Sequence, residues 1–285
     1  MPAIDLHTHS IASDGQHQPA ELVGLAAKAG LAAMALTDHD TMEGLEEALE
    51  AGRQHNIEVI PGCELAVLDG ARQLHILALW LRPPASGIQA VLTFLRMSRH
   101  ERNRTIVEKL RENGVNIEYD EVLSRAQGAV GRPHIARILL ERGIVRTSEE
   151  AFKKYLGRQG RAFAPKQELL IADAVALLKA EGATVMLAHP YLLGETGKAM
   201  EELVGRYKAL GVDGLEAYYT EHSTLRTHEY LQMARRLDMP VSGGSDFHGN
   251  LKPQIRLGVG RGKLHVPVSV LDDLKAYRRG KGLWV

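Results

Sequence analysis

Short apolar runs alternate with amphipathic helical patterns along most of this chain of 285 residues, and this alternation restricts the possible folds more than any other feature. Runs of strand length occupy residues 3–6, 31–36, 57–60, 74–80, 184–187, 214–217 and 240–242. Helical patterns occupy residues 19–29, 42–55, 201–210, 224–237 and 269–279. Such alternation predicts an α/β fold whose sheet is mostly parallel and has helical crossovers. About seven strands favour a (β/α) barrel with fewer than eight units.

The stretch between about residues 98 and 166 departs from this alternation. It is polar and helical in pattern, it shows no convincing strand, and it carries basic residues such as Arg102, Arg104 and Lys109. We therefore expect residues 98–166 to form a small helical insertion. Residues 1–97 and 167–285 are then expected to form the barrel.

The charge and the cysteine content exclude several classes of protein. Lysine plus arginine and aspartate plus glutamate both number 35, so no net charge attracts nucleic acid or a membrane. The single cysteine, Cys63, excludes an intramolecular disulfide framework and fits a reducing compartment. The N-terminal segment lacks the pattern of a signal peptide, and no run of about 18 apolar residues could span a membrane. We expect a cytoplasmic protein without a membrane partner.

Potential metal ligands follow nearly every apolar run. The chain has 13 histidines, and five of the runs lead into His7-Thr8-His9, Thr37-Asp38-His39, Gly62-Cys63-Glu64, Ala188-His189-Pro190 and Ser245-Asp246-Phe247-His248. His75 instead opens the run at residues 74–80. The carboxyl ends of barrel strands meet at one mouth. Residues i and i+2 of an extended segment point to the same side, so His7 and His9 can reach one ion together.

The number and type of these side chains indicate more than one ion. Six imidazoles and the carboxylates of Asp14, Glu64 and Asp246 exceed the three or four protein ligands that one ion takes. They predict two or three divalent ions, and Glu64 could bridge two of them. A lone histidine at a strand end is most often a satisfied polar residue, but the same residue types at five strand ends favour a metal site. Asp38 could instead orient His39 or a neighbour.

The ordered set of motifs resembles the PHP (polymerase and histidinol phosphatase) family. The resemblance is carried by Asp5-Leu6-His7-Thr8-His9-Ser10, Asp14-Gly15, Thr37-Asp38-His39-Asp40, Gly62-Cys63-Glu64, Ala188-His189-Pro190 and Gly244-Ser245-Asp246-Phe247-His248. It covers the whole chain except the helical insertion. It implies a distorted seven-stranded (β/α) barrel with a trinuclear metal centre.

The same resemblance implies a set of ligands for each ion. One ion would be bound by His7, His9, Glu64 and Asp246, a second by Glu64, His75 and His189, and a third by Asp14, His39 and His248. Some relatives carry a histidine where this chain carries Asp14, which adds a negative charge near the third ion. Mixed imidazole and carboxylate ligation suits manganese, zinc or iron(II) better than calcium. We expect Mn²⁺, with Zn²⁺ and Fe²⁺ as alternatives.

The insertion resembles a PHP subgroup that acts on nucleotides. That subgroup includes 3′,5′-nucleotide bisphosphate phosphatases and exonucleases that trim short RNA or DNA from the 5′ end, and the resemblance rests on Arg102-Asn103-Arg104 and Gly131-Arg132-Pro133-His134-Ile135-Ala136-Arg137. Pro133 suits the first position of a helix, where free N–H groups attract anions. We therefore expect an insertion that leans over the mouth and contacts the substrate through Arg102, Asn103, Arg104, Arg132 and His134. The alternative for Arg99, Arg102 and Arg104 is a solvated helix face.

Together these features predict a phosphomonoesterase that acts on a nucleotide with two phosphates. It would remove the 3′-phosphate of a 3′,5′-bisphosphorylated nucleoside, such as adenosine 3′,5′-bisphosphate, with metal ions that activate water. Asp246 or His222 would serve the leaving sugar oxygen. The alternatives are a 5′–3′ exonuclease on short oligonucleotides, a histidinol-phosphate phosphatase, and a non-catalytic, metal-stabilised interaction domain. The intact ligands disfavour the interaction domain, and the basic insertion disfavours an amine substrate.

Overall fold

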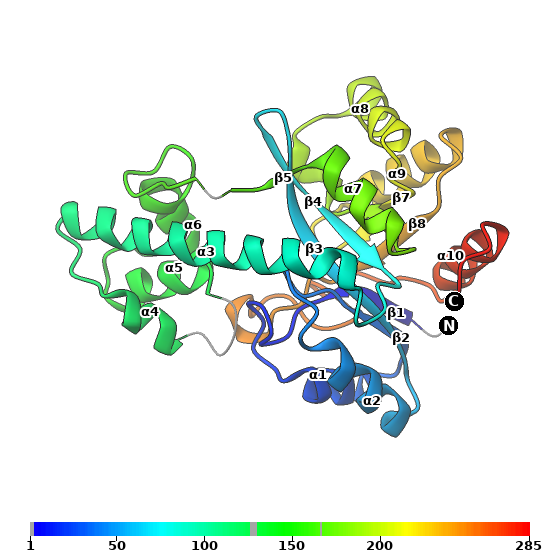
Figure 1. Cartoon of the computed structure of the whole chain (residues 1–285), viewed down its shortest axis with the longest axis horizontal. Helices are drawn as coiled ribbons and strands as arrows, with labels where there is room; N and C mark the ends of the chain where they lie inside the picture. Colours follow the sequence, from blue (N-terminus) through cyan, green and yellow to red (C-terminus); the bar gives the residue numbers. More distant parts are fainter. Residues whose placement is uncertain (1–2, 126–129, 166) are drawn as a thin grey trace.

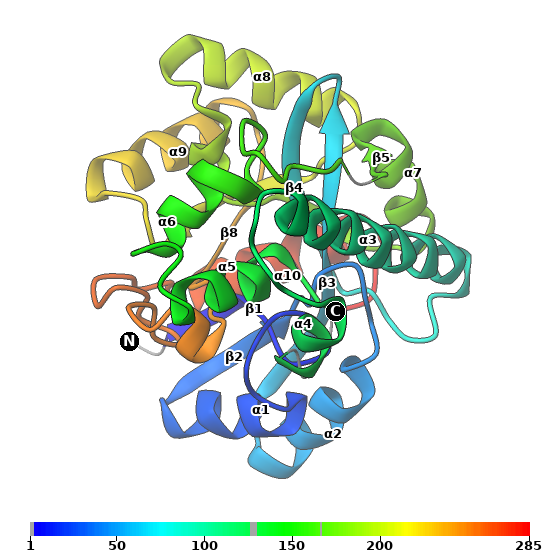
Figure 2. The same ribbon diagram turned by 90° about the vertical axis from the view of Figure 1, so that its left-hand side faces the viewer.

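A mixed β-sheet organises the chain, and the computed structural model describes residues 3–125, 130–165 and 167–285 (Figures 1 and 2). Its strands are β1 (Ala3–Thr8), β2 (Leu31–Leu36), β3 (Glu58–Asp69), β4 (Arg72–Leu79), β5 (Leu169–Leu170), β6 (Thr184–Leu187), β7 (Gly214–Tyr219) and β8 (Val241–Gly244). Its α-helices are α1 (Pro19–Lys28), α2 (Leu45–His55), α3 (Ser86–Glu112), α4 (Tyr119–Arg125), α5 (Arg132–Glu141), α6 (Ser148–Ala151), α7 (Ile171–Ala180), α8 (Gly197–Ala209), α9 (Thr224–Arg236) and α10 (Ser269–Gly280). Shorter helical turns are η1 (Phe152–Leu156), η2 (Pro190–Leu193) and η3 (Gly249–Leu251). None of the helices in the described part of the chain combines the length and the apolar character that a membrane span needs.

The sheet curves until its two ends meet. The strand order is β1-β2-β3-β4-β6-β7-β8, and β5 pairs with β3. The chain directly after β8 returns to β1, where Thr8 forms a parallel bridge with Phe247 and the backbone N–H of Asp246 donates to the carbonyl of His7 at 2.9 Å. This order confirms the expected α/β fold with a seven-stranded, barrel-like arrangement.

Strand β4 runs against the direction expected from the sequence. It pairs antiparallel with both β3 and β6, whereas the other neighbouring strands along the order are parallel. A reversed strand begins at the edge where parallel strands end. His75, near the start of β4, therefore lies at the same mouth as the residues that follow the carboxyl ends of the parallel strands.

Strand β3 is longer than the predicted strand, which covered residues 57–60 and was followed by Pro61 and Gly62. The structure continues the strand through both positions to Asp69. A Cβ atom at Gly62 would come within 2.7 Å of the Ala78 carbonyl oxygen, so glycine permits this close approach to β4. The extension places Glu64 inside a buried strand instead of after one.

The alternation of side chains along the strands divides the barrel into an interior and a covered exterior. On β2, Ala33 and Ala35 belong to the interior cluster, whereas Met34 and Leu36 pack under the surrounding helices. The local sequence explains where two of these helices begin or end. Pro19 occupies the first turn of α1, and Asn56 ends α2 in a left-handed conformation with φ 52°.

Helix α3 joins the barrel to a second lobe. Figure 1 shows it as a long helix that leaves the sheet and runs out to α4, α5 and α6. Its first half contributes Leu92 and Leu95 to the main core, and its second half contributes Ile106 and Leu110 to a separate core. The expected boundary at residue 98 therefore falls inside a continuous helix. The division into a barrel and an insertion stays a prediction, which the two separate cores support.

Asp5 fastens the two ends of the sheet together. Its carboxylate is fully buried and accepts the backbone N–H of Ser245 at 2.8 Å, the hydroxyl of Ser245 at 2.5 Å and the backbone N–H of Gly258 at 2.8 Å. Three donors from the far end of the chain thus converge on one side chain of β1.

We expect Asp5→Asn to lower the free energy of unfolding by about 2–3 kcal/mol, because the amide nitrogen would face donors that need an acceptor. Urea denaturation in the presence of a chelator measures this loss without a contribution from metal binding. The matched control is Asp273→Asn, at an exposed position on α10, which should change stability by less than about 0.5 kcal/mol. Equal stability of the two variants would show that the Asp5 contacts do not hold the sheet together.

Candidate metal centre

The nine predicted ligands gather at one end of the barrel. His7 and His9 lie at and just after the end of β1, and His39 follows β2. His189 follows β6, and the pair Asp246 and His248 follows β8. Glu64 and His75 enter from the antiparallel β3–β4 pair, so different parts of the chain converge on the same mouth.

The carboxylate of Glu64 lies at the middle of this cluster. Its Oε2 atom is 3.1 Å from His7 Nε2, 3.2 Å from His9 Nε2 and 3.3 Å from His39 Nδ1. Its Oε1 atom points the other way, 2.7 Å from His75 Nδ1 and 3.0 Å from His189 Nε2. One carboxylate therefore meets five imidazoles, an arrangement that suits a ligand shared between two ions.

Asp246 and Asp14 lie at the two ring nitrogens of His248. Asp246 Oδ1 is 3.2 Å from His9 Nε2 and 3.5 Å from His248 Nδ1. Asp14 Oδ1 is 3.3 Å from His248 Nε2, and Asp14 Oδ2 is 3.9 Å from His39 Nε2. The carboxylates thus alternate with imidazoles around the cluster.

Three groups of side chains are close enough to hold an ion each. They are His7, His9, Glu64 and Asp246; His9, Asp14, His39 and His248; and His39, Glu64 and His75. The first group equals one of the expected sets, and the second adds His9 to another. The third has His39 where His189 was expected, although His189 also contacts Glu64.

The unsatisfied polar atoms of the cluster fit a divalent cation. His9 Nε2 and His39 Nδ1 are buried and make no hydrogen bond within the described part of the chain, although both face Glu64. Buried ring nitrogens of this kind are costly unless a proton donor or an ion meets them. Mixed nitrogen and oxygen donors are the ligands that zinc, manganese and iron prefer.

Burial and the charges of the cluster together shift the pKa values of its histidines in opposite directions. Burial by itself lowers the pKa of His9, but the carboxylates of Asp246 and Glu64 outweigh it and raise the pKa to about 9. The pKa of His7 is likewise raised well above its usual value against the effect of burial. Burial dominates at His39 and lowers its pKa to about 3. Burial would raise the pKa of Glu64, yet the neighbouring histidines hold it well below its usual range.

Several residues that the sequence did not single out fix the orientation of these ligands. Glu216 accepts a hydrogen bond from His7 Nδ1 at 3.0 Å and from the backbone N–H of His189 at 2.7 Å. Lys252 Nζ and the Tyr219 hydroxyl both donate to Asp246 Oδ2 at 2.8 Å. The one sequence signal for Glu216 is that it is a charged residue inside the otherwise apolar run at residues 214–217.

Asp38 supports the loop after β1 and not His39. It accepts the backbone N–H of Ser10 at 2.8 Å, the Ser10 hydroxyl at 2.6 Å and the Ser13 hydroxyl at 2.5 Å. This loop connects His9 to Asp14. Asp38 was expected to orient either His39 or a neighbouring residue, and the structure favours the neighbouring residue.

A cavity of about 190 Å³ separates the cluster from three arginines of the helical lobe; we call it the arginine cavity. Its walls include His39, His75 and His248 on one side and Arg99, Arg102 and Arg132 on the other. Arg102 is only 7% exposed, and its Nε makes no hydrogen bond with any described residue. Burial, together with the nearby Arg132 and Arg99, lowers the pKa of Arg102 to about 9.

The other expected substrate residues do not line the arginine cavity. The Asn103 side chain donates to the Val130 carbonyl at 2.7 Å, and His134 Nδ1 accepts the Gly131 backbone N–H at 3.2 Å. Both contacts hold the segment just before α5, which carries Arg132 at its start. The guanidinium of Arg104 lies over the Tyr119 ring, 5.3 Å from its centroid, at an exposed position.

His222 lies away from the cluster. Its Nδ1–H donates to the Ala217 carbonyl at 2.9 Å, and its ring packs 5.3 Å from Tyr219 and 4.9 Å from Tyr230. His222 does not line the arginine cavity, and it does not line the second cavity described below. Asp246, the other residue expected to serve the leaving oxygen, does face the cluster.

A second cavity, of about 330 Å³, opens on the other side of the cluster; we call it the tyrosine cavity. It shares His39, His75 and Lys252 with the arginine cavity and continues past His189 to Tyr191 and beyond. The two cavities therefore meet at the candidate metal centre.

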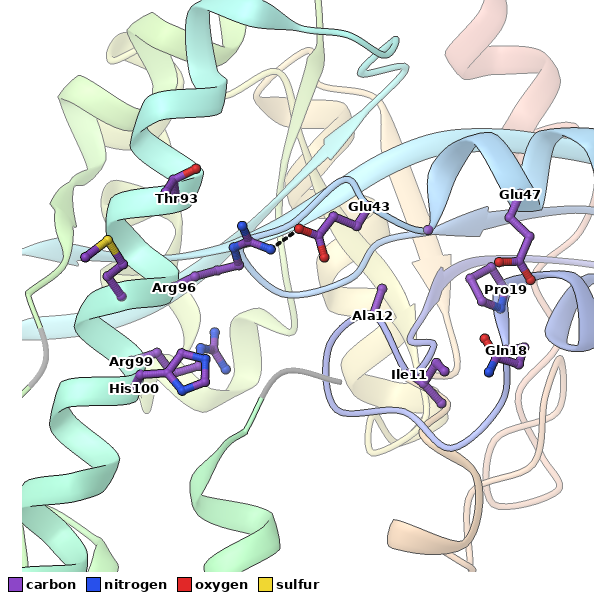
Figure 3. A pocket seen from close by; sticks show the side chains of 12 residues that line it. Ile11, Ala12, Gln18, Pro19, Glu43, Glu47, Thr93, Arg96, Arg99 and His100 are labelled. Carbon is purple, nitrogen blue, oxygen red and sulfur yellow. Dashed lines mark hydrogen bonds and ion pairs between the residues drawn. The ribbon is translucent and has the colours of Figure 1, made fainter. Parts of the chain in front are cut away.

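A larger cavity, of about 570 Å³, lies outside this centre, between α3 and the chain after β1 (Figure 3). Arg99 lines both it and the arginine cavity, and Arg96 pairs with Glu43 across it. None of the nine candidate ligands lines it. Its size alone therefore does not make it the reactive site.

Comparisons with known proteins agree with this geometry. A model of the PHP domain matches residues 5–169. The chain is 36% identical to a 5′-3′ exoribonuclease of Haemophilus influenzae over 86% of its length and 89% of the relative. It is 33% identical to a 3′,5′-nucleoside bisphosphate phosphatase of Chromobacterium violaceum over 87% of its length and 88% of the relative.

Solved structures agree as well. The structure of an amidohydrolase from Chromobacterium violaceum, with bound sulfate and no metal, superposes with a TM-score of 0.84 at 30% identity and covers 96% of both chains. Because the family model matches residues 5–169 and these relatives align with most of the sequence, the chain belongs to the PHP domain family.

Proposed function

We propose that this protein is a metal-dependent phosphoesterase that removes the 3′-phosphate of 3′,5′-bisphosphorylated nucleosides and leaves the 5′-monophosphate. One observation carries the proposal. Arg102 is a buried guanidinium whose Nε makes no hydrogen bond with any described residue, and it faces the candidate metal centre across a small cavity. A buried cation of this kind needs an anion, and guanidinium groups bind phosphate in a bidentate fork.

We propose all nine clustered side chains as metal ligands. One ion would be held by His7, His9, Glu64 and Asp246, a second by Glu64 and His75 with His39 or His189, and a third by Asp14, His39 and His248 with His9. Bound divalent ions supply an activated water and neutralise charge on the phosphoryl oxygens. We expect manganese, with zinc or iron(II) as alternatives.

The arginine cavity gives the substrate its orientation. The phosphate to be cut would lie at the cluster, and the uncut 5′-phosphate would lie between Arg102 and Arg132, with Arg99 nearby. Asn103 and His134 act indirectly, because they hold the segment that presents Arg132. Water oxygen then bonds to phosphorus, the bond from phosphorus to the 3′ oxygen breaks, and the 3′ oxygen gains a proton. Lys252, which donates to Asp246 and lines both cavities, is better placed than His222 to stabilise that oxygen.

The relatives support this class of reaction but name two substrates. One is called a bisphosphate phosphatase and another an exoribonuclease. The sulfate bound in the related amidohydrolase supports a site for a tetrahedral anion. A 5′–3′ exonuclease is the second candidate function, and the tyrosine cavity favours it, since a single bisphosphate does not need that space. Three arginines disfavour an ammonium substrate such as histidinol phosphate.

We expect ion binding at neutral pH to release about two protons per chain. The raised pKa values of His7 and His9 keep both imidazoles protonated at neutral pH when no ion is present, and an ion binds only the neutral ring. Titration calorimetry with Mn²⁺ in two buffers of different ionisation enthalpy counts the protons. His9→Asn should release about one proton fewer. Heats that do not depend on the buffer would contradict the ligand assignment.

We expect Glu64→Gln to retain about one ion fewer per chain than Asp14→Asn, because a shared carboxylate serves two ions. Metal analysis after dialysis, together with phosphate release, compares the two variants. Full metal content and full activity in Glu64→Gln would rule out a bridging role.

We expect Arg132→Ala to lower kcat/KM for adenosine 3′,5′-bisphosphate by roughly tenfold to a hundredfold, the cost of one charge-assisted contact of about 1.5–3 kcal/mol. An aryl phosphate lacks the second phosphate, so its hydrolysis should change little. Arg137→Ala is the matched control, because Arg137 is exposed and pairs with Glu141 on the same helix. Equal losses on both substrates would remove the role of Arg132 in specificity.

A further inference from the structure

We infer that the ion held by Asp14 binds tightly only together with a phosphate, so that the substrate completes the metal centre when it arrives. This inference rests on the proposed function and deepens it, because it concerns how that centre is loaded. The side chains close enough to hold this ion are His9, Asp14, His39 and His248; we call them the Asp14 group. All of them except His9 line the arginine cavity, so this ion lies at the cavity wall.

The Asp14 group carries less negative charge than the group that shares His9 with it. Asp14 is its only carboxylate, whereas the group of His7, His9, Glu64 and Asp246 has two. Those four residues are buried, and none of them lines the arginine cavity. A divalent ion at Asp14 therefore keeps more of its positive charge, and this charge lies next to the cavity.

The arginine cavity already contains positive charge that lacks a close anion. Nε of Arg102 makes no hydrogen bond with any described residue, and Arg132 donates to the neutral carbonyl of Leu156 at 3.4 Å. Glu168 also lines the cavity, where its carboxylate accepts a hydrogen bond from Gln73. Largely buried cations of this kind are costly until an anion meets them. A further divalent charge at the same wall adds to that cost.

Two more cations of this cavity draw on the charge of Asp14 itself. Arg99 pairs with Asp40 at 2.5 Å, and Lys252 pairs with Asp246 at 2.8 Å. Burial would lower the pKa of Arg99 and of Lys252, but these partners and, after them, Asp14 raise both pKa values. A divalent ion at Asp14 therefore competes with two cations that are present before it binds.

A phosphate in the arginine cavity reverses this balance. Its oxygens can contact a metal ion on one side and guanidinium groups on the other, and its negative charge neutralises both. Charges in a small, largely buried cavity are only weakly screened. The ion and the phosphate then strengthen each other's binding by the same factor, as linkage requires. The substrate-free protein holds its tighter ions around Glu64, and the position at Asp14 fills with substrate.

The test counts the Mn²⁺ bound to the full chain by equilibrium dialysis, with and without inorganic phosphate as the probe. Phosphate should tighten the weakest ion by roughly tenfold to a hundredfold, within the usual range of coupling between sites. Asp14→Asn should remove this phosphate-sensitive ion and leave the others. Arg102→Ala removes a cation, so it should tighten the same ion without phosphate and reduce the effect of phosphate to less than about fivefold. Arg102→Lys keeps the charge and should keep most of the effect, and Arg137→Ala, at an exposed position, is the control.

Ions that all bind equally tightly with and without phosphate would overturn the inference. An unchanged phosphate effect in Arg102→Ala would overturn it as well, and so would a phosphate-sensitive ion that persists in Asp14→Asn. The proposed function is tested separately, by phosphate release from adenosine 3′,5′-bisphosphate. Absence of release, with the phosphate-sensitive ion still present, would overturn the proposed function alone, because the dialysis does not depend on turnover.

Discussion

A single buried carboxylate, that of Glu64, imposes the arrangement of the mouth of this barrel. It is 1% exposed and meets five imidazoles from four other parts of the chain. A buried negative charge is tolerated only when cations or donors surround it. The segments at the ends of β1, β2 and β6 and the reversed β4 are all placed so that each contributes such a partner.

Much of this centre could be predicted from sequence because the relevant signal is local. A strand is recognised by its apolar run, and a ligand such as His7 or Asp246 stands at a fixed offset from one. The ends of parallel strands meet whatever the rest of the chain does. Strand β2 and strand β6 were therefore placed correctly to the residue, and their neighbouring ligands with them.

What the sequence did not supply depends on contacts between distant segments. The direction of β4 follows from its pairing with β3 and β6, which no periodicity encodes. Arg99, Arg102 and Arg104 have similar local surroundings in sequence, yet packing of α3 buries the first two and leaves Arg104 over Tyr119. The alternative of a solvated helix face thus describes Arg104 but not its neighbours. The role of Glu216 also depends on contacts between distant segments, because its partners come from β1 and from the turn after β6.

The shared helix α3 has a mechanical consequence. Its 27 residues extend for about 40 Å, and its two halves are embedded in two different cores. Arg99 lies at the midpoint, beside the mouth, where Asp40 holds it at 2.5 Å. Arg99 and Arg102 therefore lie on the one helix that both cores hold, whereas Arg132 is carried by α5, which contributes to the outer core. The width of the arginine cavity thus depends on how the outer lobe packs on α3, because one of its arginines belongs to that lobe and the other two belong to the shared helix.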